Sequence, residues 1–155
     1  MLRPSPRHLL PIVAVYLPVP IAGAALSARW KVGASPEGGP GDMFLRGTAL
    51  TPPLFLPALL VVGAVAARND GAAGRAGVGI VSLISVAFLA GSTANLPNDF
   101  AAAASAGTPL PLTAGLAAVH IVLSITLLAI ALPRLFRRGP PGSPGRTLDA
   151  GATAA

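Results

Sequence analysis

Four long apolar runs constrain this chain more than any other feature of its sequence. They cover residues 9–28, 51–67, 77–96 and 110–132, and none of them contains Asp, Glu, Lys or Arg. A helix rising 1.5 Å per residue needs about 20 residues to cross about 30 Å of hydrocarbon. Each run is close to that length, so the sequence predicts an all-α protein, a four-helix transmembrane bundle.

The composition supports a lipid environment. Hydrophobic residues make up 53% of the chain and charged residues 10%, against roughly 25% charged in soluble domains. The net charge of +6 would suggest nucleic acid if it formed a patch, but the basic residues lie in short segments between apolar runs. We therefore expect the lipid bilayer as a partner and no nucleic acid. The absence of Cys excludes disulfides, thiolate metal sites and a cysteine nucleophile.

The distribution of Lys and Arg predicts the orientation, because positive loops stay in the cytoplasm. With four spans, the N-terminus, the middle loop and the C-terminal tail share one side. That side carries eight of the eleven basic residues, and the other side carries Arg29, Lys31 and Arg46. We expect a multi-pass protein of the cell membrane with both termini cytoplasmic. The eight are Arg3, Arg7, Arg68, Arg75, Arg134, Arg137, Arg138 and Arg146.

The remaining segments divide into one domain and a tail. Residues 1–138 are predicted to form a single transmembrane domain. Residues 139–155 are mostly Gly, Pro and Ala, which predicts a disordered cytoplasmic tail. The first outer loop, 29–50, is rich in Gly and Pro and is predicted to be flexible, with Trp30 as an interfacial anchor.

Thr and Pro residues suggest where the helices begin and end. Thr51 is suited to cap a helix that Pro52 opens. Pro97 and Pro133 are expected to end the third and fourth spans. Between these two spans, the loop 97–109 is expected to form a short Ala-rich helical turn.

The first span carries two complications. Pro11, Pro18 and Pro20 each remove a backbone donor, which predicts a kink or a broken helix. The basic N-terminus, the apolar run and Ala22-Gly23-Ala24 are also typical of a cleaved signal peptide. The run is longer than a usual signal core, which favours retention, and the fate of this span stays open.

His120 is the only His, Asp, Glu, Lys or Arg in the four runs, and such a residue within a span indicates function by default. Helical spacing puts it on one stripe with Thr113, Ala117 and Ser124, which we expect to face the bundle. His120 could relay a proton or contact a polar ligand. The alternative is a neutral His that donates one interhelical hydrogen bond. The absence of an intramembrane carboxylate favours this alternative.

Ser82, Ser85 and Ser92 form a similar stripe in the third span. Their hydroxyls are expected to bond the preceding turn or a neighbouring helix. Tyr16 needs a partner for its hydroxyl, which a Ser or His120 across the bundle could supply. The candidate intramembrane polar site therefore consists of His120, Ser124, Ser85, Ser92 and Tyr16.

Catalytic signatures are missing from the sequence. It contains no GxxxxGK[ST], HExxH or GxSxG motif and no carboxylate pair in a span. We therefore predict no catalytic, cofactor or metal site.

Small residues four apart, such as Gly23 with Ser27 and Gly63 with Ala67, allow helices to approach closely. The favoured interpretation is an accessory or interaction subunit that binds other membrane proteins or itself. The alternative is a small-solute permease or channel component that uses the polar stripes. A third possibility is a membrane enzyme acting on a lipid or quinone through Asn95, Asp99 or His120.

Overall fold

The computed structural model describes residues 8–32 and 40–136, and these form α-helices joined by short connections. The only β pairing in this described part is an isolated bridge between Thr48 and Thr51. The predicted all-α class is confirmed, whereas the tail 139–155 lies outside the described residues. The helices are α1 (Leu9–Tyr16), α2 (Pro18–Trp30), α3 (Pro40–Leu45), α4 (Phe55–Ala66), α5 (Gly71–Ala94), α6 (Leu96–Ser105) and α7 (Leu110–Leu135).

Three helical stretches among the described residues are long and apolar enough to cross a membrane. They are Leu9–Trp30, which joins α1 and α2, then Gly71–Ala94 and Leu110–Leu135, with 22, 24 and 26 residues. Large apolar side chains on their outward faces, such as Val15, Leu83 and Val122, are exposed, as lipid-facing residues would be. These features suggest a membrane protein.

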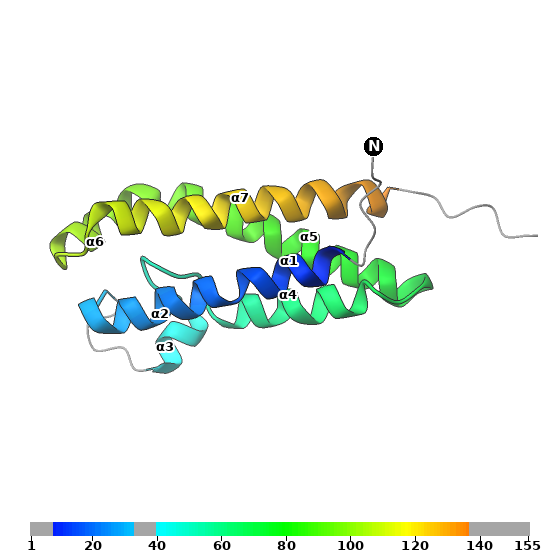
Figure 1. Cartoon of the computed structure of the whole chain (residues 1–155), viewed down its shortest axis with the longest axis horizontal. Coiled ribbons are helices and arrows are strands. Elements are labelled where there is room, and N and C mark those ends of the chain that lie inside the picture. The colour runs from blue at the N-terminus through cyan, green and yellow to red at the C-terminus, as the bar shows by residue number, and fades with distance from the viewer. Residues whose placement is uncertain (1–7, 33–39, 137–155) are drawn as a thin grey trace, which may run out of the picture.

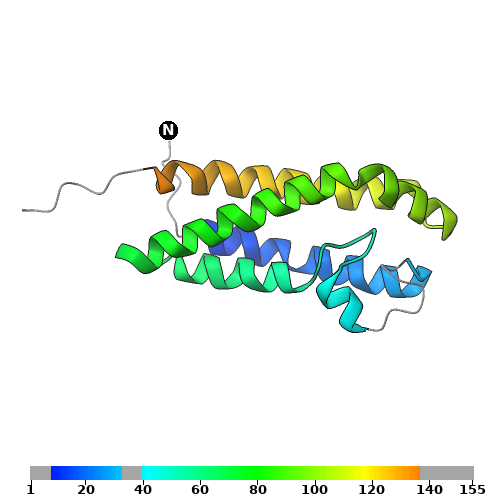
Figure 2. The same cartoon turned by 180° about the vertical axis from the view of Figure 1, so that it is seen from behind.

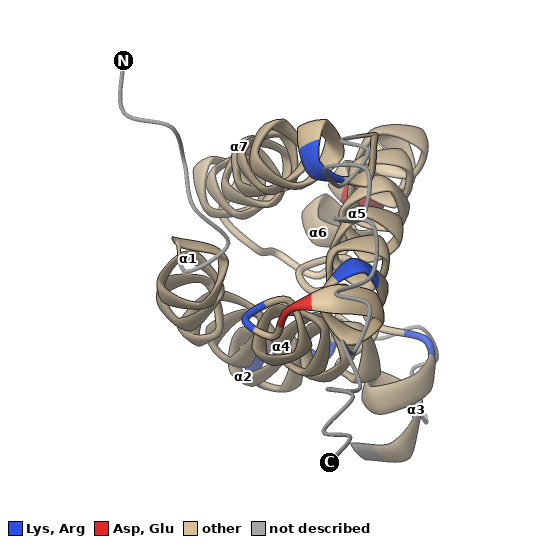
Figure 3. Cartoon of the chain, turned by 90° about the vertical axis from the view of Figure 1, so that its right-hand side faces the viewer, with Lys and Arg blue, Asp and Glu red and all other residues tan. Residues whose placement is uncertain are grey.

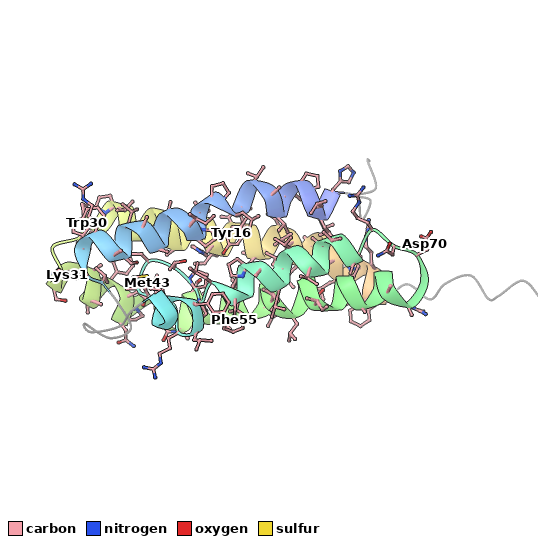
Figure 4. All side chains as sticks on the ribbon, turned by 90° about the horizontal axis from the view of Figure 1, so that it is seen from below. Tyr16, Trp30, Lys31, Met43, Phe55 and Asp70 are labelled. Carbon is pink, nitrogen blue, oxygen red and sulfur yellow. The ribbon has the colours of Figure 1, made fainter. Side chains whose placement is uncertain are left out.

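The four apolar segments run side by side along the long axis of the molecule (Figures 1 and 2). α5 packs against both α4 and α7, and α1 contacts α4 and α7. Figure 3 looks along this axis from the end at which α1 begins. We call this end, which also holds the α4–α5 turn and the end of α7, the α1 end. The opposite end, with α6 and the end of α2, is the α6 end. Figure 4 shows Trp30 at the α6 end, Asp70 at the α1 end and Tyr16 between them.

The half of the molecule nearer the α1 end is closely packed. A Cβ added to Gly77 of α5 would lie 2.6 Å from the carbonyl oxygen of Gly63 on α4 and would also meet the backbone of Ala67. Glycine at both positions lets the two backbones touch, which agrees with the small-residue spacing in the sequence. The core of this half is apolar and comprises Leu9, Val13, Leu60, Ala64, Val81, Leu127 and Ala131.

The first span is more continuous than its prolines predict. Leu17, between α1 and α2, keeps helical dihedral angles (φ −51°, ψ −40°), and its amide donates to the Val13 carbonyl over 3.0 Å. Pro18 opens α2, where the fixed φ of proline suits a first helical turn. The prolines therefore remove hydrogen bonds without ending the helical course of the chain.

The second predicted span is the interrupted one. α4 has 12 residues, or about 18 Å, too short to cross about 30 Å alone. It begins at Phe55, so Thr51 does not cap it as predicted. The two consecutive prolines at 52 and 53 lack amide donors and keep the preceding residues out of helical geometry.

Three other helix limits differ from prediction. α5 begins at Gly71, before the predicted start at residue 77. Pro97 lies in the first turn of α6, since α5 ends at Ala94. Pro133 lies inside the last turns of α7 rather than ending it. α6 itself confirms the short Ala-rich helix expected between the last two spans.

The segment 46–54, between α3 and α4, turns into the interior of the molecule (Figure 1). The Thr51 hydroxyl donates to the Pro20 carbonyl over 3.1 Å, and the hydroxyls of Thr48 and Ser27 lie 2.6 Å apart. Pro20 lies about 15 Å along the helix axis from Trp30. Non-helical backbone therefore reaches about halfway along the first apolar helix.

Candidate functional site

A pocket of about 420 Å³ occupies the α6 end between segment 46–54, the start of α4, and helices α5, α6 and α7. Apolar side chains such as Phe88 and Leu116 form part of its wall. The polar residues contributed by these elements include Thr51, Ser92, Asn95, Asp99, Thr113 and His120. The pocket is therefore amphiphilic and lies where a full-length α4 would otherwise pack.

Threonines hold the loop wall of the pocket in place. Thr48 Oγ1 accepts hydrogen bonds from the amides of Leu50 and Thr51, each over 3.2 Å. The backbones of Thr48 and Thr51 also exchange two hydrogen bonds, of 2.8 and 3.3 Å. Gly23 of α2 accommodates the loop, because a Cβ there would lie 2.5 Å from the Leu50 carbonyl oxygen. The loop thus provides hydrogen-bond partners for several of its own backbone groups while it packs against α2.

Polar side chains continue from the pocket along the facing sides of α5 and α7. Thr113, His120 and Ser124 are each less than 5% exposed, which confirms the stripe expected on the fourth span. On α5, Ser82 and Ser85 are buried and Ser92 lines the pocket. His120 lies about 10 Å deeper than Thr113 along α7, and Ser85 lies about 10 Å deeper than Ser92 along α5.

Three rings from three helices meet at the inner end of the pocket. The ring centroids of Tyr16 on α1 and His120 on α7 are 5.5 Å apart, with the rings perpendicular. Phe88 on α5 lies 5.8 Å from Tyr16 and 6.4 Å from His120. Tyr16 and His120 are therefore in ring contact, but the hydrogen bond expected for the Tyr16 hydroxyl is not formed. Phe88 and His120 line the pocket, and Tyr16 lies behind them.

The hydrogen bond of His120 stays within its own helix. Nδ1 lies 2.7 Å from the Leu116 carbonyl oxygen, which can only accept, so Nδ1 carries the hydrogen. In the neutral form of this ring, Nε2 is then an acceptor. The interhelical hydrogen bond considered from the sequence is thus replaced by a bond to the preceding turn.

Of the serines on α5 that were predicted to bond the preceding turn or a neighbouring helix, Ser82 does so, whereas Ser85 Oγ has no partner. Ser82 donates to the Val78 carbonyl over 2.9 Å, and Ser124 donates to the His120 carbonyl over 2.7 Å. Five buried side-chain atoms in the described part of the chain have no hydrogen-bond partner: Tyr16 Oη, Ser85 Oγ, Thr108 Oγ1, Thr113 Oγ1 and His120 Nε2. Each buried polar group left unsatisfied costs about 1–3 kcal/mol.

Asp99 contributes the carboxyl group of the pocket. It lies in the first turn of α6 and is half-buried beside the pocket. This burial raises the pKa of Asp99 to about 6. The neutral and charged forms of this carboxyl are therefore both populated near pH 6.

The structure brings together only part of the predicted site. His120 and Ser92 line the pocket, Tyr16 contacts His120, and Ser85 and Ser124 lie deeper. The sequence did not predict that segment 46–54 forms a wall of the pocket, although its two prolines after Gly47 indicate a non-helical stretch. No protein-family model, curated protein or solved structure matches this chain.

Proposed function

We propose that this chain is a small multi-pass membrane protein that binds a small polar solute in the pocket at the α6 end, as a permease or channel component. The observation that carries this proposal is the non-helical backbone of segment 46–54 beside the first apolar helix. Non-helical backbone at membrane depth is tolerated where it lines a water-filled cavity or is buried in protein. Here that segment forms a wall of a pocket lined by hydroxyls, amides and a carboxyl group.

The proposed topology has four crossings, with α4 and segment 46–54 together forming the second one. Interrupted crossings of this kind form the binding sites of many transporters. The basic residues that precede α1, lie near the α4–α5 turn and follow Leu132 outnumber those near the α6 end by eight to three. This excess supports cytoplasmic termini, so that the pocket opens to the outside.

A flux assay tests the proposed function. Proteoliposomes holding the full chain would be screened with small polar solutes, and the pocket variants His120→Leu and Ser92→Ala compared with the wild type. We expect a flux that each pocket variant lowers at least tenfold. Ser82→Ala is the matched control, because that hydroxyl bonds its own helix and lies outside the pocket lining. Absent flux across the panel, or equal flux in all variants, would contradict the proposal.

A second candidate is the accessory or interaction subunit. It is favoured by Gly79 on α5 and Gly115 on α7, where a Cβ would meet no described atom within 4 Å. Such open small residues allow another membrane helix to approach closely. Purification in a mild detergent, followed by crosslinking, should then yield a complex that Gly79→Leu or Gly115→Leu disrupts. Recovery of a monomer alone would remove the basis for this candidate.

A further inference from the structure

Polar groups without partners extend deeper into the molecule than the pocket itself. Among the five unpartnered atoms, Thr113 Oγ1 belongs to the pocket wall. Tyr16 Oη, Ser85 Oγ and His120 Nε2 belong to α1, α5 and α7. His120 lines the pocket, Tyr16 contacts the His120 ring, and Ser85 lies about one helical turn from the pocket-lining Phe88. The ring contacts of Tyr16, Phe88 and His120 bring these helices together at one depth.

The chemistry of these atoms suits water. Tyr16 Oη and Ser85 Oγ can each donate and accept. Nε2 of a neutral His120 accepts, because the Nδ1–H group donates to the Leu116 carbonyl. Buried waters bridge otherwise unsatisfied polar groups with two to four hydrogen bonds.

Apolar residues end this polar region on the other side. Val13, Leu60, Val81 and Leu127 come from α1, α4, α5 and α7. They are 0–1% exposed and belong to one core cluster. Below them, Gly63 and Gly77 bring α4 and α5 into backbone contact. The Ser82 hydroxyl, at this level of α5, already donates to the Val78 carbonyl, and the cluster itself offers water no hydrogen-bonding side chain.

We infer that water enters from the pocket past Phe88, reaches Tyr16, Ser85 and His120, and stops at the apolar cluster of Val13, Leu60, Val81 and Leu127. The pocket is then the mouth of an aqueous half-channel that is open only at the α6 end. Its occupants are water and solutes of similar size that form hydrogen bonds. This inference rests on the proposed function for the direction in which the pocket opens.

Single cysteines test the half-channel in a chain that naturally has none. Ser92→Cys probes the pocket, Ser85→Cys the inner end, and Ser82→Cys the level of the apolar cluster. Leu83→Cys, on an outward-facing and exposed position of the same helix, is the lipid-facing control. Proteoliposomes would be treated from outside with silver ions, which are close to water in size and react with thiols in water. The protein is then denatured and treated with an alkylating reagent. A cysteine that has bound silver is protected from this reagent, so the unalkylated fraction measures the reaction with silver.

We expect Ser92→Cys and Ser85→Cys to react at least tenfold faster than Ser82→Cys and Leu83→Cys. A slow Ser85→Cys beside a fast Ser92→Cys would overturn the half-channel and leave the pocket of the proposed function intact. A fast Ser82→Cys would overturn its closed end. Slow reaction at both Ser92→Cys and Ser85→Cys would overturn the half-channel and the water-open pocket together.

The test also separates the half-channel from solute transport. Fast reaction of Ser85→Cys with no flux for any solute would overturn the proposed function and support the half-channel. If the Ser85→Cys variant does not elute from a size-exclusion column at the same volume as the wild type, its fold is altered. Ser124→Cys then takes its place with the same expectation. Ser124 lies about 6 Å past His120 along α7.

Discussion

The two halves of this molecule use the same neighbouring helices to opposite effect. Towards the α1 end, α4 lies against α5 with glycines at the contact, and the interior is apolar. Towards the α6 end, α4 is replaced by segment 46–54, and a pocket with polar walls separates this segment from α5 and α7. The length of α4 therefore decides which half is filled by packing and which half is hollow.

The residues of α5 match this division. Gly74 and Gly77 lie in the packed half and are buried, whereas Gly91, Ser92 and Asn95 lie in the hollow half and line the pocket. One helix thus carries a contact surface for α4 and, further along, a wall of the pocket. Substitutions that act on one half at a time can break or sharpen this comparison.

Gly77→Ala should have the largest effect, because the added Cβ meets backbone atoms of α4 that cannot rotate away. We expect a loss near the upper end of the range of about 1–3 kcal/mol typical of overpacking. The measurement is the free energy of unfolding in mixed micelles. Gly79→Ala is the control, since no described atom lies within 4 Å of its Cβ. Equal stability of the two variants would contradict the packed half.

Gly23→Ala should have a smaller effect, because the atom it meets, the Leu50 carbonyl oxygen, belongs to a loop that can shift. We expect a loss of about 1–2 kcal/mol, in the lower part of the overpacking range. The same unfolding measurement applies, with Gly115→Ala as the open-space control. A loss as large as that of Gly77→Ala would mean that the loop is as rigid as the helix contact.

Thr51→Val removes the hydrogen bond to the Pro20 carbonyl while nearly keeping the shape of the side chain. A net loss of about 1 kcal/mol is expected for one such hydrogen bond. Thr126→Val is the comparison, because that hydroxyl bonds the Val122 carbonyl on its own exposed helix face. A smaller loss for Thr51→Val than for Thr126→Val would show that the loop is not fixed at this depth.

Asp99→Asn should have the smallest effect, and one that depends on pH. Burial raises the pKa of Asp99 to about 6, so folding favours the neutral carboxyl. The stability of the wild type relative to the variant should fall as pH rises from about 4 to about 6, weakly because water screens this half-exposed group. Melting temperatures of both proteins across this interval provide the measurement. A constant difference, or one that grows with pH, would contradict the burial of this carboxyl.

Much of the fold could be predicted because long uncharged runs leave few alternatives to apolar helices. The inward stripe of Thr113, His120 and Ser124 followed from helical spacing in the same way. The short α4 could not be found so easily, because residues 52–54, two prolines and one leucine, belong to a long uncharged run although the prolines lack amide donors. The partners of Tyr16 and His120 depend on how α1, α5 and α7 pack, which spacing within one helix does not reveal.

The depth of Trp30 in a bilayer tests the central claim most directly. It is the only Trp in the chain, it lies at the α6 end of the first apolar helix, and Arg29 stacks 5.6 Å from its ring. In bilayers of lipids brominated at known positions, we predict the strongest quenching of its fluorescence by bromines near the headgroups, about 15 Å from the bilayer centre. Strongest quenching at the centre, or none at any depth, would contradict a loop and pocket lying within the membrane.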